Sequence, residues 1–302
     1  MDFGRVPENE LDTVNFTLAE EPAWNKKILN GVKDRNVKVY IGCARWGSKE
    51  WIGKIYPKGT SDTQLLDEYV KHYNAIELNA THYKLYNPAD IKKWAAKARD
   101  NDFLFCPKVY EGISHVGNLI DKQFLTDTFL GGVTAFGKNL GPVFLQVSDK
   151  FGPKRKEELY QYLASLPKDV TFFLEVRQSE WFLQQHFSEL LSYLEKLKIG
   201  LVITDTAGRR DCCHMHLTMP RAFIRFVGNS LHPTDYKRID DWVQRIQYWL
   251  NNGLAELYFF MHMPDEAFSP ELSVYLVEQV NKICNLDLKK PKFITENLLF
   301  KD

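Results

Sequence analysis

The sequence predicts an α/β protein consisting of a single TIM-type (β/α)8 barrel with an N-terminal extension. Short runs rich in β-branched and aromatic residues alternate with longer segments of helical period, which is typical of βα units around a parallel sheet. Eight such runs can be counted, the number that a closed barrel requires. No linker rich in Gly, Pro or Ser divides the 302 residues, so we expect one domain.

The first 35 residues are mostly polar, and Trp24, Ile28, Leu29 and Val32 are among their few apolar points. We therefore expect residues 1–35 to form an arm packed on the barrel, and residues 36–302 to form the barrel itself. The eight strands are expected at 38–43, 75–79, 103–108, 142–147, 171–176, 200–204, 222–227 and 256–262.

Helical segments separate most of these strands. The first, at 61–73, opens on a candidate N-cap at Ser61 or Asp62, and the second, at 87–98, opens on Asn87 with Pro88 in its first turn. Between the sixth and seventh strands we expect a long loop instead of a helix. The remaining helices are expected at 122–138, 154–164, 181–197, 237–251 and 270–285.

The alternative architecture is an open, doubly wound sheet, which would need a Gly-rich turn of GxGxxG spacing after the first strand. The glycines in and after that strand, Gly42, Gly47 and Gly53, do not have this spacing. The closed barrel is therefore the favoured prediction.

Composition narrows the partners and the compartment. Lys plus Arg and Asp plus Glu both number 39, so no overall positive charge attracts nucleic acid, which is disfavoured as a partner. No run approaches the 18 apolar residues of a membrane span, and the acidic start lacks the features of a secretory signal. The five cysteines include no CxxC pair, which favours a reducing, cytoplasmic location. The oligomeric state is left open.

A polar residue stands at the carboxyl end of nearly every strand. Side chains two positions apart share a face of a strand, so Glu77 and Asn79 should both point into the barrel. The same holds for Glu175 with Arg177. Lys108 and Asp205 are in phase with apolar neighbours, and their direction stays open. By analogy we place further inward side chains at Gln146, Arg225 and His262.

Such charges are costly inside a protein core unless they are paired or used. One explanation is that Glu77 and Glu175 simply neutralise the lysine and arginines around them. Pairing alone does not explain why the charges gather at one end of the strands, where barrel enzymes bind their ligands. The sequence therefore predicts a ligand site at the carboxyl ends of the strands.

Several motifs in order resemble the DUF72, or YecE-like, family. They are the runs IGCARWGSKEW, AIELNATHY, FLFCPKVYEGISH, GPVFLQVS and FFLEVRQSEW. The resemblance spans about residues 38–285 and implies a TIM-barrel-like fold but no particular reaction. Two family positions differ here, because Val227 stands where members commonly have His and His262 lies near a family Asn. The matching residues are Trp46, Glu77, Asn79, Thr81, Tyr83, Lys108, His115, Gln146, Glu175, Arg177 and Trp181.

The chemistry available favours a small anionic ligand, bearing phosphate or carboxylate, or a sugar-like one. Carboxylates beside cations can act as acid and base, and arginine suits bidentate contact with anions. The candidate catalytic residues are Glu77, Glu175 and Lys108. The candidate ligand-binding residues are Trp46, Asn79, Tyr83, Gln146, Arg177, Asp205, Arg209, Arg225 and His262.

Other functions remain open at this point. One is a noncatalytic, metabolite-binding barrel, and another is a metal-dependent or nucleic-acid-related hydrolase of the endonuclease-like barrel type. No cofactor is predicted, although a divalent metal could be bound by the carboxylates and His262. A second metal-like group is formed by Cys212, Cys213, His214 and His216, but adjacent cysteines do not match tetrahedral zinc spacing. The role of Arg209 and Arg210 in the same loop is left open.

Overall fold

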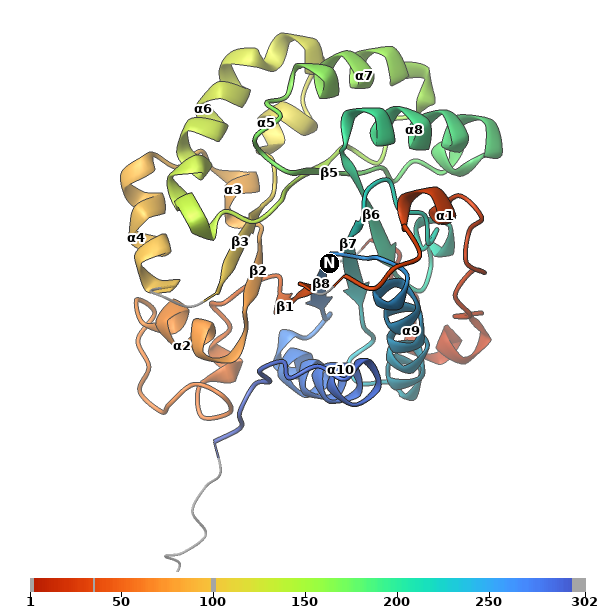
Figure 1. The fold of residues 1–302 in the computed structure, drawn as a ribbon. Coiled ribbons are helices and arrows are strands. Elements are labelled where there is room, and N and C mark those ends of the chain that lie inside the picture. Colours follow the sequence, from red (N-terminus) through yellow and green to blue (C-terminus); the bar gives the residue numbers. More distant parts are fainter. Residues whose placement is uncertain (1–2, 35, 99–101, 295–302) are drawn as a thin grey trace, which may run out of the picture.

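The computed structural model describes residues 3–34, 36–98 and 102–294. The expected arm (1–35) and barrel (36–302) also include residues 1–2, 35, 99–101 and 295–302, which lie outside this description. Within the described ranges the chain forms eight parallel strands, arranged as a barrel surrounded by helices (Figure 1). The strands are β1 (Lys38–Cys43), β2 (Ala75–Leu78), β3 (Leu104–Pro107), β4 (Val143–Gln146), β5 (Phe172–Glu175), β6 (Gly200–Asp205), β7 (Arg221–Val227) and β8 (Glu256–His262).

The strands follow the order β3-β2-β1-β8-β7-β6-β5-β4, in which every neighbouring pair is parallel. The ends of this order, β3 and β4, meet through isolated bridges between Phe105 and Leu140 and between Lys108 and Phe144. The Val109 amide donates to the Phe144 carbonyl at 3.0 Å across this junction. The predicted barrel is therefore confirmed, with a short seam between β3 and β4.

The expected long helices are present, but the first of them begins at Leu65 with Gln64 in the N-cap position, so neither Ser61 nor Asp62 caps it. Between β6 and β7 the described chain forms only one 3-10 turn, Arg210–Cys212, as the absence of a helical pattern indicated. No helix in the described part of the chain has both the length and the apolar character needed to cross a bilayer. The α-helices are α1 (Asn25–Ile28), α2 (Leu65–His72), α3 (Ala80–Tyr83), α4 (Pro88–Ala98), α5 (Glu111–Ser114), α6 (Gln123–Val133), α7 (Lys156–Ser165), α8 (Gln184–Leu197), α9 (Pro233–Asn251) and α10 (Ser269–Cys284).

Inside the barrel, apolar and polar side chains occupy successive layers. The apolar layer comes from the earlier strand positions and consists of Tyr40, Ala75, Cys106, Phe144, Phe173, Val202, Phe223, Tyr258 and Phe260. Since the side-chain period of a strand is two, the next inward position lies two residues later. On β2 to β8, within two residues of the strand end, these next positions hold Glu77, Lys108, Gln146, Glu175, Thr204, Arg225 and His262.

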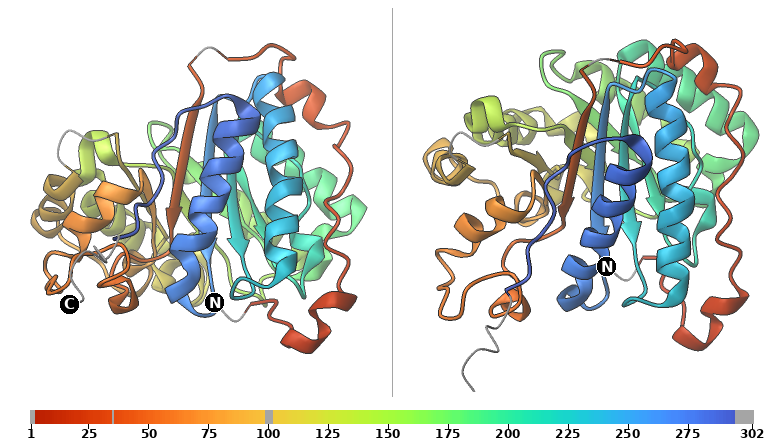
Figure 2. Two further views of the ribbon diagram at one scale, coloured as in Figure 1. Left: turned by 90° about the horizontal axis from the view of Figure 1, so that it is seen from below. Right: turned by 60° about the horizontal axis from the view of Figure 1, so that its bottom comes forward.

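The N-terminal arm runs along the outside of the barrel. Figure 2 shows it in red, passing beside α9 from the carboxyl ends of the strands to their amino ends before it enters β1. Glu21 forms an ion pair of 3.0 Å with Arg245 of α9. Further along, the Trp24 indole donates to the Leu217 carbonyl at 2.8 Å. These contacts tie the later part of the arm to the barrel.

Candidate functional site

Glu77 and Arg225 form a fully buried ion pair at the centre of the polar layer. Arg225 donates from Nε and Nη2 to the two carboxylate oxygens of Glu77, each at 2.8 Å. Asn79 donates to one of these oxygens and His262 Nε2 lies 2.9 Å from the other. Burial alone would raise the pKa of the Glu77 carboxyl, but the attraction of Arg225 outweighs it and holds the pKa well below its ordinary value.

Glu175 occupies the other side of the same guanidinium. Arg225 Nη1 donates to it at 2.7 Å, Arg177 Nε donates at 2.7 Å, and the Thr204 hydroxyl donates at 3.1 Å. Burial again raises the pKa of this carboxyl, yet Arg177 and Arg225 together bring it down to about 2. Both carboxylates are therefore ionised at neutral pH and both are held by Arg225.

Lys108 stands next to this group without a counter-charge of its own. Its Nζ makes no hydrogen bond or ion pair with any residue in the described ranges. Burial lowers the pKa of the ammonium group to about 8, and the repulsion of Arg225 adds to the effect. Gln146 lies on the neighbouring strand, and its buried side-chain oxygen accepts no hydrogen bond from the described residues.

Most of these side chains face a cavity of about 870 Å3 at the carboxyl ends of the strands, while Glu175 and Thr204 do not line it. We call this cavity the pocket. Tyr83 is 70% exposed at its border, while Trp46 packs edge-to-face on Trp94 with ring centroids 5.3 Å apart. The sequence-predicted residues that line the pocket are Trp46, Glu77, Asn79, Tyr83, Lys108, Gln146, Arg177, Arg225 and His262.

Three other predicted residues do not line the pocket, namely Glu175, Asp205 and Arg209. Glu175 lies behind the lining, bonded to Arg177 and Arg225. Asp205 stands two positions after Ile203, which packs in the outer core between strands and helices. The two side chains share a face of β6, so the Asp205 side chain also points out of the barrel.

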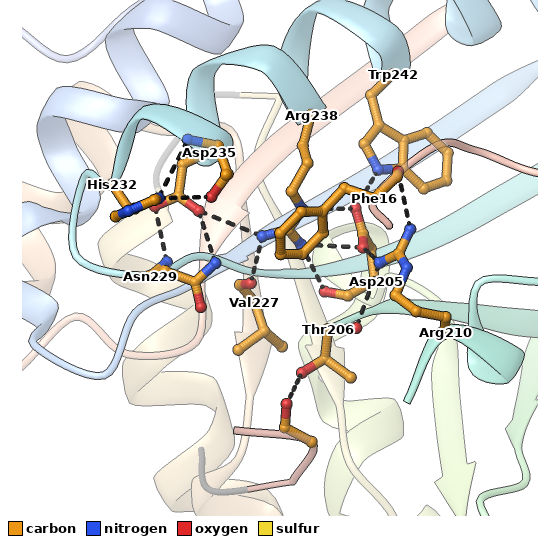
Figure 3. A network of polar contacts seen from close by, with 12 residues as sticks. Phe16, Asp205, Thr206, Arg210, Val227, Asn229, His232, Asp235, Arg238 and Trp242 are labelled. Atoms are coloured by element: carbon orange, nitrogen blue, oxygen red, sulfur yellow. Dashed lines mark hydrogen bonds and ion pairs between the residues drawn. The ribbon is translucent and has the colours of Figure 1, made fainter. Parts of the chain in front are cut away.

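There Asp205 joins a separate buried network on α9, shown in Figure 3. It accepts hydrogen bonds from the Trp242 indole at 2.7 Å and from Arg238, and it pairs with Arg210. Burial raises the pKa of this carboxyl, but Arg238 and Arg210 lower it overall. The Phe16 ring of the arm lies against both guanidinium groups, with centroid distances of 4.9 and 5.3 Å. Asp205 thus holds the barrel, α9 and the arm together.

Arg209 also acts outside the pocket lining. Its guanidinium pairs with Asp211 at 2.7 Å and donates to the Arg177 carbonyl. It also lies over the Phe3 ring, 5.2 Å from the centroid. In this arrangement Arg209 positions its neighbours instead of facing the cavity.

Sequence reasoning missed several residues of the lining, namely Phe3, Arg45, Asp149 and Glu266. Asp149 lies 3.7 Å from Arg177, and Glu266 lies 4.0 Å from Arg45. All four belong to segments outside the strands, where the period of two gives no information. A usable signal for Arg45 and Asp149 was their position within three residues of a strand end.

Among the described residues no group of three or more His, Cys, Asp or Glu side chains is arranged to hold a metal ion. Cys212 and Cys213 are buried, and burial raises the pKa of both thiols. His214 packs against Phe187 with ring centroids 5.2 Å apart, and its Nε2 lies 3.2 Å from the Val202 carbonyl.

Comparison with known proteins gives consistent results. Residues 40–293 match the model of the family described as protein of unknown function DUF72. The UPF0759 protein YecE of Escherichia coli is 29% identical over 263 residues, which cover 81% of this chain and 93% of YecE. The UPF0759 protein YunF of Bacillus subtilis is 27% identical over 164 residues, covering 52% of this chain and 57% of YunF.

Solved structures show the same fold at low sequence identity. A DUF72 family protein of Enterococcus faecalis superimposes with a TM-score of 0.63 at 18% identity, covering 85% of this chain and all of that protein. A DUF72 family protein of Thermotoga maritima gives a TM-score of 0.60 at 19% identity, covering 82% of this chain and all of that protein. The family match spans most of the chain and the fold agrees with it. This protein therefore belongs to the DUF72 family.

Proposed function

We propose that the pocket binds a small ligand that carries a phosphate or carboxylate group, or a sugar-like ligand with such a group. The observation that carries this proposal is the buried, unpaired ammonium group of Lys108. This residue is 7% exposed at the pocket lining, and its Nζ has no ion pair among the described residues. A buried ammonium group without a counter-charge costs several kcal/mol, which is why its pKa is lowered. A ligand anion would supply the missing charge.

The protein's own carboxylates do not fill this role. Glu77 uses both oxygens on Arg225, and Glu175 bonds Arg177 and Arg225. Lys108 is close enough for both carboxylates to act on its pKa, yet it bonds neither. An anion entering from the cavity meets Lys108 and Arg177 on the same lining.

Neutral and aromatic groups of the lining suit a hydroxyl-bearing ligand. The side-chain oxygen of Gln146 is buried and has no partner among the described residues, so it can accept a bond from a ligand hydroxyl. The faces of Trp46 and Tyr83 at the border can pack on the apolar side of a sugar ring. These features support a sugar phosphate or a hydroxy acid over a bare inorganic ion.

Acid–base chemistry on such a ligand would run through Glu77 and His262. Glu77 lies 2.9 Å from His262 Nε2, and since a carboxylate oxygen only accepts, His262 donates from Nε2 to Glu77. Nδ1 is the ring nitrogen left for a ligand. Glu77 by itself would have to leave Arg225 before it could take a proton from a ligand.

A second candidate function is ligand binding without catalysis. It is favoured by the fact that the two carboxylates expected as acid and base are both engaged with Arg225. The two candidates differ in the fate of the bound ligand. Recovery of a captured ligand chemically unchanged after prolonged incubation would favour the noncatalytic function, and a time-dependent product that disappears in His262→Asn would favour catalysis.

The binding proposal is tested by isothermal titration with glucose 6-phosphate, glucose and sulfate at pH 7.5. We expect glucose 6-phosphate to bind more tightly than glucose, because only the former carries an anion for Lys108. Lys108→Met should weaken glucose 6-phosphate binding at least roughly tenfold, as for loss of a charge-assisted contact. Lys92→Met, which removes an exposed lysine of α4, is the matched control and should change nothing. Equal affinities for the wild type and Lys108→Met would contradict the proposal.

A further inference from the structure

The N-terminal arm reaches the pocket itself. Phe3 lies among the lining residues, together with side chains from the barrel strands. Its ring lies over the guanidinium of Arg177, 4.0 Å from the ring centroid, while Arg177 Nε donates to Glu175. Arg209 packs on the same ring at 5.2 Å. Phe3 thus forms a side of the pocket over one of its cationic groups.

Backbone contacts hold Phe3 in this place. The Thr206 hydroxyl lies 3.1 Å from the Phe3 carbonyl and 3.0 Å from the Gly4 carbonyl, which also accepts from the Gly208 amide at 2.7 Å. Gly4 has a φ of +67°, and a Cβ there would lie 2.5 Å from a methyl carbon of Thr206. Glycine is therefore required at this turn, and the turn determines where the Phe3 ring lies.

Further contacts, more distant from Phe3, hold the arm on the barrel. Leu11 and Phe16 pack with Ala207 in a small apolar cluster. In Figure 3, Phe16 lies beside Arg210 and Arg238, and Arg210 donates to the Phe16 carbonyl at 3.2 Å. The barrel residues that hold the arm thus belong to the loop after β6 and to helix α9. They lie next to the pocket without lining it.

The residues that match the family model begin at residue 40. Phe3 and the anchors on the arm precede that point, so this side of the pocket comes from outside the family-matched region. The strand-end groups, in contrast, all fall within it. A difference in ligand choice can therefore arise from the arm while the barrel groups stay the same.

We infer that Phe3 is a specificity-determining residue of the pocket, limiting the size of the molecule that can reach Lys108 beside Arg177. This inference rests on the proposed function for its biological meaning, but the steric claim stands on the contacts of Phe3 alone. Arg209 is the positioning residue for this ring, because it contacts the ring and the Arg177 backbone at once.

The steric claim is tested without any ligand, by the rate at which reagents of two sizes modify Lys108. The reagents are formaldehyde with cyanoborohydride, which is small, and trinitrobenzenesulfonate, which is bulky; both react with the neutral amine at pH 8. Peptide mass spectrometry gives the ratio of the bulky rate to the small rate. Phe3→Ala should raise this ratio roughly tenfold, on the scale by which pocket shape discriminates ligands. The protein is made without an N-terminal tag.

Two further variants keep this test decisive. Phe3→Trp enlarges the same side chain and should lower the ratio, so the inference does not depend on one variant. Arg209→Ala should raise the ratio, and its effect should not add to that of Phe3→Ala, since both act through one ring. Phe124→Ala removes a ring that is 80% exposed on α6 and is the control. An unchanged ratio in Phe3→Ala and Phe3→Trp would overturn the inference.

Binding data separate this inference from the proposed function. If the inference holds, Phe3→Ala also shifts the ratio of affinities toward the larger probe, glucose 6-phosphate, relative to sulfate. If the wild type binds neither probe, the proposed function fails, while the labelling ratio still decides the role of Phe3.

Discussion

At the scale of single residues, Arg225 is the charge on which the polar layer depends. It is 1% exposed and bonds two buried carboxylates, so its removal leaves two negative charges facing each other in the barrel. Breaking a buried ion pair from one side costs about 3–5 kcal/mol. We expect Arg225→Met to lose at least this much unfolding free energy in urea denaturation.

A compensating variant checks the cause of this loss. In the combination Glu77→Gln, Glu175→Gln and Arg225→Met the buried charges are removed together. Its loss of stability should be smaller than the sum of the single losses, because the residues form one network. Additive losses would show that Arg225 acts by packing and not by charge.

The lowered pKa of Lys108 makes the free energy of unfolding depend on pH in the alkaline range. Its pKa is about 8 in the folded protein against an ordinary value of 10.5, so the unfolded chain binds more protons between these values. Stability therefore rises with pH across this window, where the folded protein has already released its proton. Relative to Lys108→Met, the wild type should gain roughly 2 kcal/mol between pH 7 and pH 10. Parallel stability curves for the two proteins would contradict the lowered pKa.

The alternation of side chains along a strand predicted the inward side chains well where the polar residues of a run all share one face. The run AIELNAT places Glu77 and Asn79 on one face and apolar residues on the other, and both line the pocket. Lys108 could not be placed in this way, since Cys106 before it is apolar but belongs to the inner layer. In a filled barrel both faces of a strand are apolar, so hydrophobicity alone does not distinguish inside from outside.

At the scale of elements, Asp205 shows how a strand-end carboxylate can serve packing. It joins β6 to α9 through Arg238 and Trp242, and it does not line the pocket. We expect Asp205→Asn to lose about 3–5 kcal/mol of unfolding free energy, because Arg210 loses its counter-charge and Arg238 keeps only Asp235. Glucose 6-phosphate affinity at a temperature where the variant is folded should stay unchanged. A selective loss of affinity without loss of stability would instead assign Asp205 to the ligand.

Elements with strong local signals were predictable, and contacts made by loops were not. Helix α9 begins at Pro233, four residues before the expected start, because the His232 side chain caps the Thr234 amide and Pro233 suits the first turn. The course of the arm along α9 depends on long-range contacts such as Glu21 with Arg245. No local pattern encodes such a contact.

At the scale of the whole molecule, the barrel is closed unevenly. Adjacent strands β7 and β8 pair over seven residues, whereas β3 and β4 meet only through isolated bridges in the described chain. Fewer ladder hydrogen bonds mean a lower free energy of local opening. We expect the amides of Val109 and Gly141 at the seam to exchange with deuterium faster than those of β7 and β8. Equal protection would show that side-chain packing, and not the ladder, governs opening.

The number of strands, their order along the chain and the inward direction of most polar strand-end side chains followed from the sequence because all three depend on periodicity. The missing helix between β6 and β7 was also visible in the sequence. The loop residues that complete the pocket could not be predicted, because Phe3 and Glu266 approach it from segments separated by most of the chain.

The central claim, that an anion binds at Lys108, is tested most directly by sulfate affinity between pH 7 and pH 10. Sulfate keeps its charge in this range, and so do Glu77, Glu175 and Arg225, which act on Lys108. Burial lowers the pKa of His82 and of His115, which keeps both neutral in the same range.

Isothermal titration should therefore show an affinity that is constant below pH 8 and falls by up to about tenfold per pH unit above it, as one ammonium group loses its proton. Lys108→Met should bind weakly and without this dependence, while Lys92→Met should follow the wild type. A wild-type profile that is flat through pH 10, or the same fall in Lys108→Met, would contradict the account.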